Sequence, residues 1–323
     1  MSDQIGTDHP PLRLGTRRSA LAMAQSGMVA KAVAELTGRQ VELVEITTYG
    51  DTSREALAQI GGTGVFVSAL RDALLAGDID LAVHSLKDLP TAAPEGLVLA
   101  AVPEREDPRD ALVARDGLSL QELVEKSAHS GRPARIGTGS PRRLAQLNSW
   151  ARETGASIES VAIRGNVDTR IGYVASGELD AVVLAAAGLN RLGRLGEATQ
   201  ILDSELMLPA PGQGALAVEC SAADAELASA LAALDHAPTR AAVTAERALL
   251  AALEAGCSAP VGALASSTPQ GETTLRALVG TVDGATVVQL SATGTGSPEE
   301  LGRALAARML AEGAAGLMGE RIK

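Results

Sequence analysis

Strand-like and helix-like segments alternate along most of this chain, and that alternation constrains the fold more than any other feature. Many Ala, Leu and Val residues suit both kinds of segment, and their spacing separates one kind from the other. The first series is expected to form a strand, a helix, a strand, a helix and two strands, at residues 12–15, 19–36, 41–47, 65–76, 79–84 and 97–102. Strands joined by helices pair in parallel through right-handed crossovers, so an α/β sheet is predicted.

The same alternation restarts after a Pro-rich, charged stretch at 103–110 (PEREDPRD). Strands and helices are expected in turn at 134–137, 141–152, 158–163, 167–176 and 180–185. A second Pro/Gly-rich stretch at 208–214 (LPAPGQG) leads to a strand and two helices, expected at 215–220, 223–234 and 239–255. Such stretches are typical of crossings between domains.

The pattern changes from Ala259 onward, where three strand-like runs are joined by turns such as Asp283-Gly284 and followed by one helix. The expected ranges are 261–265, 273–282, 285–292 and 298–315. We therefore predict an α/β protein: two similar doubly wound α/β domains around a cleft, plus a smaller α+β domain with a three-stranded antiparallel sheet. The expected domains are residues 12–107 with 213–235, residues 108–212, and residues 236–323.

Composition excludes several classes of function. The 323 residues carry a net charge of -11, which opposes general attraction to nucleic acid or anionic membranes. Aromatic residues make up 1% of the chain, too few for a base-stacking platform. No apolar run approaches the roughly 18 residues of a membrane span. The polar start, MSDQIGTDHPP, is read as the tail of a cytoplasmic protein.

Basic residues gather where predicted strands lead into helices. Arg17 and Arg18 follow the first strand in LGTRRSALA, where Ser19 is placed to cap the helix. Arg142 and Arg143 follow another strand in IGTGSPRRL. In that segment Ser140 stands at the N-cap and Pro141 at the first helical position; Arg164 and Arg170 occupy a third junction, IRGNVDTR.

Helix N-termini and arginine forks both suit carboxylate or phosphate groups, and in open α/β sheets such junctions converge beyond the carboxyl ends of the strands. Surface charges or interdomain ion pairs are the alternative reading of these arginines. Their concentration in an acidic protein favours a small ligand with several anionic groups. No nucleotide-binding glycine motif and no metal-binding histidine pattern is present in the sequence.

Two further residues are candidates for chemistry. Asp88 follows a predicted strand in HSLKDLP, where a carboxylate can stabilise a cation or move protons; the alternative is that it pairs with Lys87 or a turn amide. Cys257 lies in the loop LEAGCSAPVG and is a candidate nucleophile. His84 is expected to be a structural histidine and Cys220 a buried, inert thiol. With two cysteines 37 positions apart, neither a disulfide framework nor a metal site is expected.

Taken in order, these motifs resemble the porphobilinogen deaminase family, also called hydroxymethylbilane synthase, from Leu12 onward. The matching stretches are GTRRSALA, GDIDLAVHSLKDLP, EREDPRDAL, IGTGSPRR, RGNVDTR, AAAGLNRLG, LPAPGQGALAVEC and LEAGCSAPVG. The resemblance implies a transferase of tetrapyrrole and haem biosynthesis. It would join four porphobilinogen molecules, each losing ammonia, onto an enzyme-bound chain and then release hydroxymethylbilane by hydrolysis.

The resemblance also implies roles for individual residues. Cys257 would carry a dipyrromethane cofactor through a thioether, and Asp88 would be the catalytic aspartate. The arginines expected to take part in catalysis and substrate binding are Arg17, Arg164, Arg170 and Arg191. Further substrate contacts are expected from Ser19, Gln25 and Gln213. Cofactor contacts are expected from Ser85, Lys87, Asp88, Thr138, Ser140, Arg142, Arg143 and Arg170.

One departure from the family pattern stands in the glycine-rich loop, where Gln59 and Thr63 replace lysines that other members often carry. That loop is assigned a lid role, with Phe66 as a ring contact. Two alternatives remain: a non-catalytic two-lobed anion-binding module of the periplasmic-binding-protein type, and an inactive relative. Porphobilinogen is the expected partner, with no nucleic acid, membrane or metal, and a monomer is expected.

Overall fold

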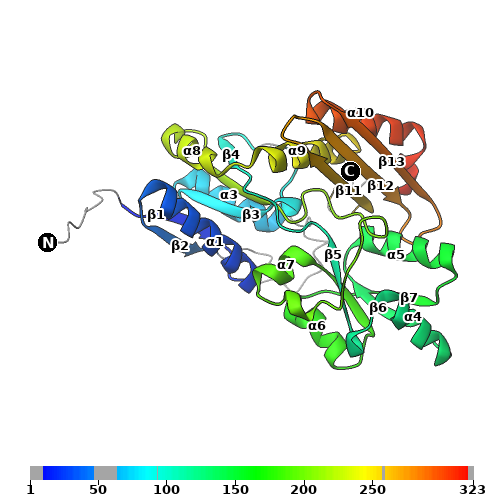
Figure 1. Ribbon diagram of the computed structural model, residues 1–323. Helices are drawn as coiled ribbons and strands as arrows, with labels where there is room; N and C mark the ends of the chain where they lie inside the picture. Colours follow the sequence, from blue (N-terminus) through cyan, green and yellow to red (C-terminus); the bar gives the residue numbers. More distant parts are fainter. Residues whose placement is uncertain (1–9, 47–63, 93, 257–258, 319–323) are drawn as a thin grey trace. The chain divides into compact units, whose positions relative to one another are not determined.

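The computed structural model describes residues 10–46, 64–92, 94–256 and 259–318 (Figure 1). The chain divides into two compact units, residues 1–105 with 215–240 and residues 106–214 with 241–323. The predicted fold class is confirmed: the chain forms two similar five-stranded α/β sheets and, near the C-terminus, a three-stranded antiparallel sheet. The three domain boundaries stay a prediction. Among the described helices, none combines the length and apolarity needed to cross a membrane.

The first unit contains a mixed sheet that we call, with its helices, the first lobe. Its strands, in spatial order, are β2 (Val41–Glu45), β1 (Leu12–Thr16), β3 (Leu81–Ser85), β10 (Leu216–Ser221) and β4 (Leu97–Ala101). Its helices are α1 (Ala20–Thr37), α3 (Gly64–Ala76), α8 (Ala225–Leu231), and the short η1 (Leu86–Asp88) and η4 (Ala232–Leu234). Strand β1 pairs in parallel with β2 and β3, as predicted, whereas β10 runs antiparallel to β3 and β4.

Helices cover both faces of this sheet because its strands are apolar on both sides. Helices α1 and α8 bury Val29, Val33 and Leu227 against one face, together with Leu14 and Val218 of the strands. Helix α3 covers the other face through a separate apolar cluster. Burial on both faces explains why the strands read as apolar runs in the sequence.

The second unit begins with a second sheet, which with its helices we call the second lobe. Its strands, in spatial order, are β7 (Ile158–Ala162), β6 (Ala134–Thr138), β8 (Ala181–Ala185), β5 (Asp110–Ala114) and β9 (Gln200–Ile201). Its helices are α4 (Leu120–His129), α5 (Pro141–Thr154), α6 (Val167–Ala175), α7 (Ala186–Arg191), and the short η2 (Arg115–Gly117) and η3 (Leu195–Glu197). Helices α4 and α5 cover one face, and α6 and α7 the other.

The two lobes repeat the same construction. In each sheet one strand, β1 or β6, pairs in parallel with its neighbours on both sides. The strand after these in spatial order, β10 or β5, runs antiparallel to them. Gly15 and Gly137 are the fourth residues of β1 and β6. A Cβ on Gly15 would lie 2.3 Å from Ile79 Cδ1, and a Cβ on Gly137 would lie 2.5 Å from Leu179 Cδ1. Glycine at this position lets the chain pack closely against the apolar residue before the next strand.

The C-terminal module packs three antiparallel strands against two helices. These elements are α9 (Ala237–Ala252), β11 (Val261–Ser267), β12 (Thr273–Gly280), β13 (Val287–Gly294), α10 (Pro298–Ala311) and the short η5 (Ala314–Leu317). Leu249 of α9, Leu275 of β12 and Met309 of α10 meet in its core. The predicted three strands and final helix are confirmed, with the helix ending earlier than expected.

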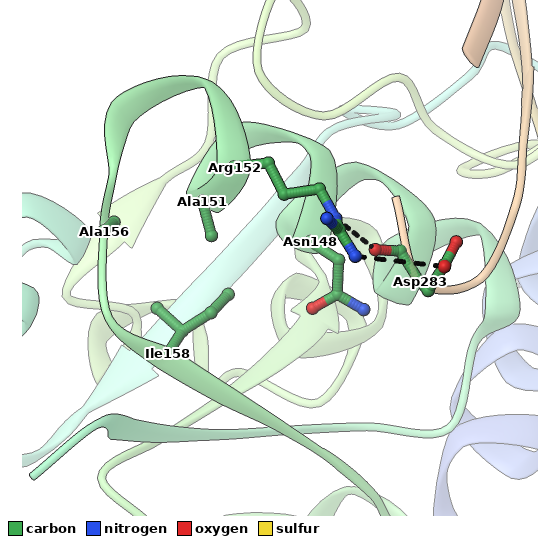
Figure 2. A pocket seen from close by; sticks show the side chains of 6 residues that line it. All are labelled: Asn148, Ala151, Arg152, Ala156, Ile158 and Asp283. Atoms are coloured by element: carbon green, nitrogen blue, oxygen red, sulfur yellow. Dashed lines mark hydrogen bonds and ion pairs between the residues drawn. The ribbon is translucent and has the colours of Figure 1, made fainter. Parts of the chain in front are cut away.

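The turn between β12 and β13 contacts helix α5 (Figure 2). Asn148 donates to the carbonyl of Val282 at 2.8 Å, and Arg152 Nε donates to the carbonyl of Asp283 at 2.9 Å. Gly284 has φ of +68°, and a Cβ there would lie 2.2 Å from the backbone nitrogen of Ser149. A left-handed glycine is therefore needed for the turn to approach the helix this closely. No predicted site residue lines the pocket beside it.

Candidate functional site

A cavity of about 170 Å³ lies in the first lobe, beyond the carboxyl ends of β1 and β3. Five residues predicted for the site line it: Arg17, Ser19, Gln25, Ser85 and Asp88. The rest of the lining comes from α1, α3 and β3: Leu21, Ala22, Val67, Leu70, Val83 and His84. The structure thus gathers an arginine, a carboxylate and several hydroxyl and amide groups in one small, partly apolar cavity.

Asp88 is placed by a short helix that follows β3 without a loop. Its neighbours Leu86 and Leu89 are buried, which anchors η1 on both sides of Lys87 and Asp88. Leu89 is extended (φ −82°, ψ 126°), as expected for the residue before Pro90. The buried leucines leave the Asp88 side chain at the cavity wall. Lys87 stands beside it on η1 and is half-buried.

The start of α1 forms another wall of the cavity. Ser19 accepts a hydrogen bond from the backbone N–H of Ala22 at 3.3 Å, so the predicted helix cap is confirmed. Gln25, one turn further on, donates to Ser85 Oγ at 2.9 Å and so joins α1 to the end of β3. A helix N-terminus with Arg17 beside it is suited to a carboxylate.

Behind the cavity lies a buried polar chain that the sequence did not reveal. Arg71 of α3 binds Glu219 of β10 with two hydrogen bonds, of 3.0 and 2.7 Å. His84 Nε2 lies 3.2 Å from Oε2 of the same carboxylate. Burial alone would raise the pKa of Glu219, but the neighbouring His84 and Arg71 lower it to about 2. His84 is buried, as expected of a structural histidine, although its Nε2 makes no hydrogen bond to the described residues.

The low pKa of Glu219 predicts a loss of stability in acid. Its folded-state pKa of about 2 lies below the ordinary 4.5, so its contribution is complete above about pH 4.5 and is lost as the pH falls toward 2. We expect Glu219→Gln to flatten this part of the pH dependence, measured as urea midpoints at several pH values. The exposed Glu226→Gln of α8 is the control and should keep the wild-type slope; equal slopes for both variants would contradict the prediction.

Arg142 and Arg143 lie at the start of α5 and are 3% and 5% exposed. Both bind the buried carboxylate of Asp110: Arg142 Nη1 at 2.8 Å, and Arg143 at 3.1 Å through Nε and 2.7 Å through Nη2. Arg143 also donates to the carbonyl of Val183 at 2.8 Å, and Arg142 to that of Leu208. Burial opposes ionisation of Asp110, but the two guanidinium groups hold its pKa well below the usual range.

Three other predicted residues lie around this cluster. Gln213 donates to Asp110 at 2.8 Å and to the carbonyl of Pro108 at 2.7 Å. Thr138, fully buried at the end of β6, accepts from the N–H of Ser140 at 3.3 Å. Ser140 stands at the N-cap of α5, as predicted, but its side chain makes no capping hydrogen bond.

Two other predicted arginines of the second unit donate to backbone carbonyls. Arg170 Nε donates to Gly165 at 2.9 Å, and Arg191 Nη2 donates to Gly214 at 2.6 Å. Burial lowers the pKa of Arg170, and the nearby charge of Arg143 lowers it further. Burial likewise lowers the pKa of Arg191. Arg164 is exposed. The carbonyls that Arg170 and Arg191 contact are neutral, so these hydrogen bonds leave both charges available for an anion.

Several predictions fall outside the described residues: Cys257, Gln59 and Thr63. The backbone of Phe66 belongs to α3. Cys220 is buried, as expected, and burial raises the pKa of its thiol to about 11. Sequence reasoning missed Asp110, whose one signal is its place at the start of an apolar run after PEREDPR.

Comparison with known proteins supplies the final observation. The family model "Porphobilinogen deaminase, dipyromethane cofactor binding domain" matches residues 12–229, and "Porphobilinogen deaminase, C-terminal domain" matches residues 240–311. Porphobilinogen deaminase 1 of Streptomyces avermitilis is 69% identical over 320 residues, 96% of this chain and 98% of that protein. The porphobilinogen deaminase of Thermobifida fusca is 56% identical over 313 residues, 94% of each. An ancestral cationic amino acid solute-binding protein aligns with a TM-score of 0.41 and 18% identity, covering 69% of this chain and 87% of that one.

Proposed function

The chain belongs to the porphobilinogen deaminase family, and from that premise we propose that Asp88, with the predicted arginines, deaminates porphobilinogen and that Cys257 carries the cofactor. The observation that carries this proposal is the match of both family models, which together cover nearly all of the chain. The cavity at Asp88 supports it, because an arginine, a helix N-terminus and a carboxylate suit a substrate with two carboxylates and a departing amine.

The described residues fit a dipyrromethane, whose side chains are carboxylates. Nε of Arg142 and Nε of Arg191 are buried and have no hydrogen-bond partner among the described residues, so each has a donor left for an anion. Arg142 and Arg143 together carry one more positive charge than Asp110 neutralises. When bound, the cofactor supplies the free pyrrole α-carbon to which substrate is joined.

The chain's own residues then have distinct tasks. Arg17 and the N-terminus of α1 bind and orient substrate carboxylates. The carboxylate of Asp88 stabilises the positive charge that develops on the substrate as its amine leaves as ammonia. Gln25 and Ser85 hold the end of β3 against α1, which keeps Asp88 in place. The apolar residues Leu70 and Val83 limit water in the cavity, which strengthens these interactions.

Intact-mass measurement tests the covalent part of the proposal. Purified wild-type protein should exceed its sequence mass by two porphobilinogen units less two ammonia molecules. Cys257→Ser should lack this increment, and the control Cys220→Ala should keep it, because Cys220 is a core residue. An active wild type without added mass would contradict attachment at Cys257.

Incubation with porphobilinogen tests catalysis itself. Wild-type protein should release ammonia and a linear tetrapyrrole, whereas a binding module or an inactive relative would release neither. We further propose that the enzyme works as a cytoplasmic monomer on this small molecule, without nucleic acid or membrane. The net charge of -11 supports the absence of polyanionic partners.

A further inference from the structure

The two lobes share one topology, and at three positions where the first lobe carries its buried polar chain the second lobe carries apolar residues. Their registers can be aligned from the strand glycines: Gly15 of β1 pairs with Ala82 of β3, and Gly137 of β6 pairs with Val182 of β8. The antiparallel neighbours β10 and β5 then correspond as well. Residues at corresponding positions of the two sheets can therefore be compared directly.

The strand positions of the buried polar chain have apolar counterparts. Glu219 lies opposite Ala82 in the first lobe, and Val113 lies opposite Val182 in the second, so Glu219 corresponds to Val113. By the same registers, His84 corresponds to Leu184.

The counterpart of Arg71 in the second lobe is found from the glycine turns that follow α3 and α6. Gly77 and Gly177 each have positive φ, and each donates to the carbonyl three residues earlier, after α3 and α6 respectively. Arg71 lies six positions before Gly77, and Ile171 lies six positions before Gly177. Arg71 therefore corresponds to Ile171.

The fold does not require the charges. In the second lobe Val113, Leu184 and Ile171 lie in a single apolar cluster on the matching face of the sheet. Replacing a buried ion pair by apolar residues of similar volume is often neutral or stabilising, since desolvation of the charges is costly. The Arg71–Glu219 pair, 13% and 2% exposed, is therefore better explained by a role other than stability.

The polar residues that distinguish the first lobe lie next to its cavity. His84 ends the polar chain, and it also lines the cavity with Asp88. We propose, building on the proposed function, that His84 is a positioning residue for the deamination of porphobilinogen, its imidazole fixed in the cavity wall by Glu219 and Arg71.

The contact with Glu219 fixes where the imidazole of His84 lies. Its Nε2 is 3.2 Å from a carboxylate oxygen of Glu219, and that carboxylate is itself held by Arg71 of α3. The same side chain lines the cavity together with Arg17 and Asp88, so a shift of the ring changes the wall against which a dicarboxylate substrate lies.

Transplanting the apolar solution of the second lobe tests the proposal. The variant Arg71→Ile, Glu219→Val, His84→Leu should fold with an unfolding midpoint equal to or above that of wild type. Its turnover should fall by roughly 10- to 100-fold, the range expected when a reacting group is misplaced. Ile171→Val, a core change at the matching site of the second lobe, is the control and should keep wild-type turnover. A folded triple variant with wild-type turnover overturns the proposal.

A single substitution decides the matter even if the triple variant does not fold. His84→Gln keeps an amide N–H for Glu219 and removes Nδ1. We expect its unfolding midpoint to stay close to wild type, while kcat falls by roughly 10-fold or more and KM changes little. Wild-type kcat in the folded variant overturns the proposal, because a purely structural role would leave turnover per folded molecule as it is.

Two checks distinguish a failure of the His84 proposal from a failure of the proposed function. Intact mass establishes the cofactor load of each variant, and rates are compared per loaded molecule. Loss of turnover confined to the variants supports the role of His84. A wild type that releases no ammonia from porphobilinogen overturns the proposed function and this inference together.

Discussion

Asp88→Asn should lower turnover of porphobilinogen by roughly 100- to 1,000-fold, the range seen when one group that stabilises transition-state charge is removed. The substitution keeps the size of the side chain and removes only its charge. The fold should survive, because η1 is anchored by the buried Leu86 and Leu89 and the Asp88 side chain lies at the cavity wall. Asp88→Ala should likewise retain the fold and lose nearly all turnover.

Ammonia release measures the effect, and thermal unfolding checks the fold. Asp78→Asn makes the same chemical change in an exposed residue just before β3, so it serves as the control and should be fully active. Near-normal turnover in Asp88→Asn would remove this residue from the mechanism.

Asp110→Ala should have the largest effect on stability, about 3–5 kcal/mol of the free energy of unfolding. The substitution leaves Arg142 and Arg143 buried without a carboxylate, and Gln213 loses an acceptor. Uncompensated buried charge is far more costly than the pair itself is stabilising.

Urea unfolding followed by tryptophan fluorescence reports this change directly. Trp150, the one tryptophan of the chain, lies in α5, the helix that begins beside the two arginines. The control Asp116→Asn breaks an exposed pair with Lys126 and should leave the urea midpoint close to that of wild type. If both variants unfold at the same urea concentration, the Asp110 cluster does not stabilise the lobe.

Local signals predicted most of the elements. Ser19 and Gly38 mark the ends of α1, and Pro141 marks the start of α5. The strand β5 was missed because it begins with a charged residue directly after a Pro-rich stretch. Helix α4 was missed although Ser119 and Glu122 form a capping box, a pattern that is visible in the sequence.

The candidate site was only partly predictable, for a physical reason. Motifs identified which residues to examine, but the partners of a buried charge come from distant parts of the chain. Arg71 and Glu219 are separated by 148 positions and meet only because β10 lies next to β3. Arg142 and Arg143 were expected at a ligand-facing junction, and the structure adds Asp110 as their shared internal partner. Neither pairing has a signature in local spacing.

The place of β10 between β3 and β4 also determines when the first lobe can be completed during translation. At roughly 5–20 residues per second, the ribosome needs on the order of ten seconds to move from β4 to β10. All five strands of the second sheet, β5 to β9, are made within that interval. The nascent chain should therefore finish its second lobe first, because the sheet of the first lobe is complete only when β10 has been made and can pair with β3 and β4.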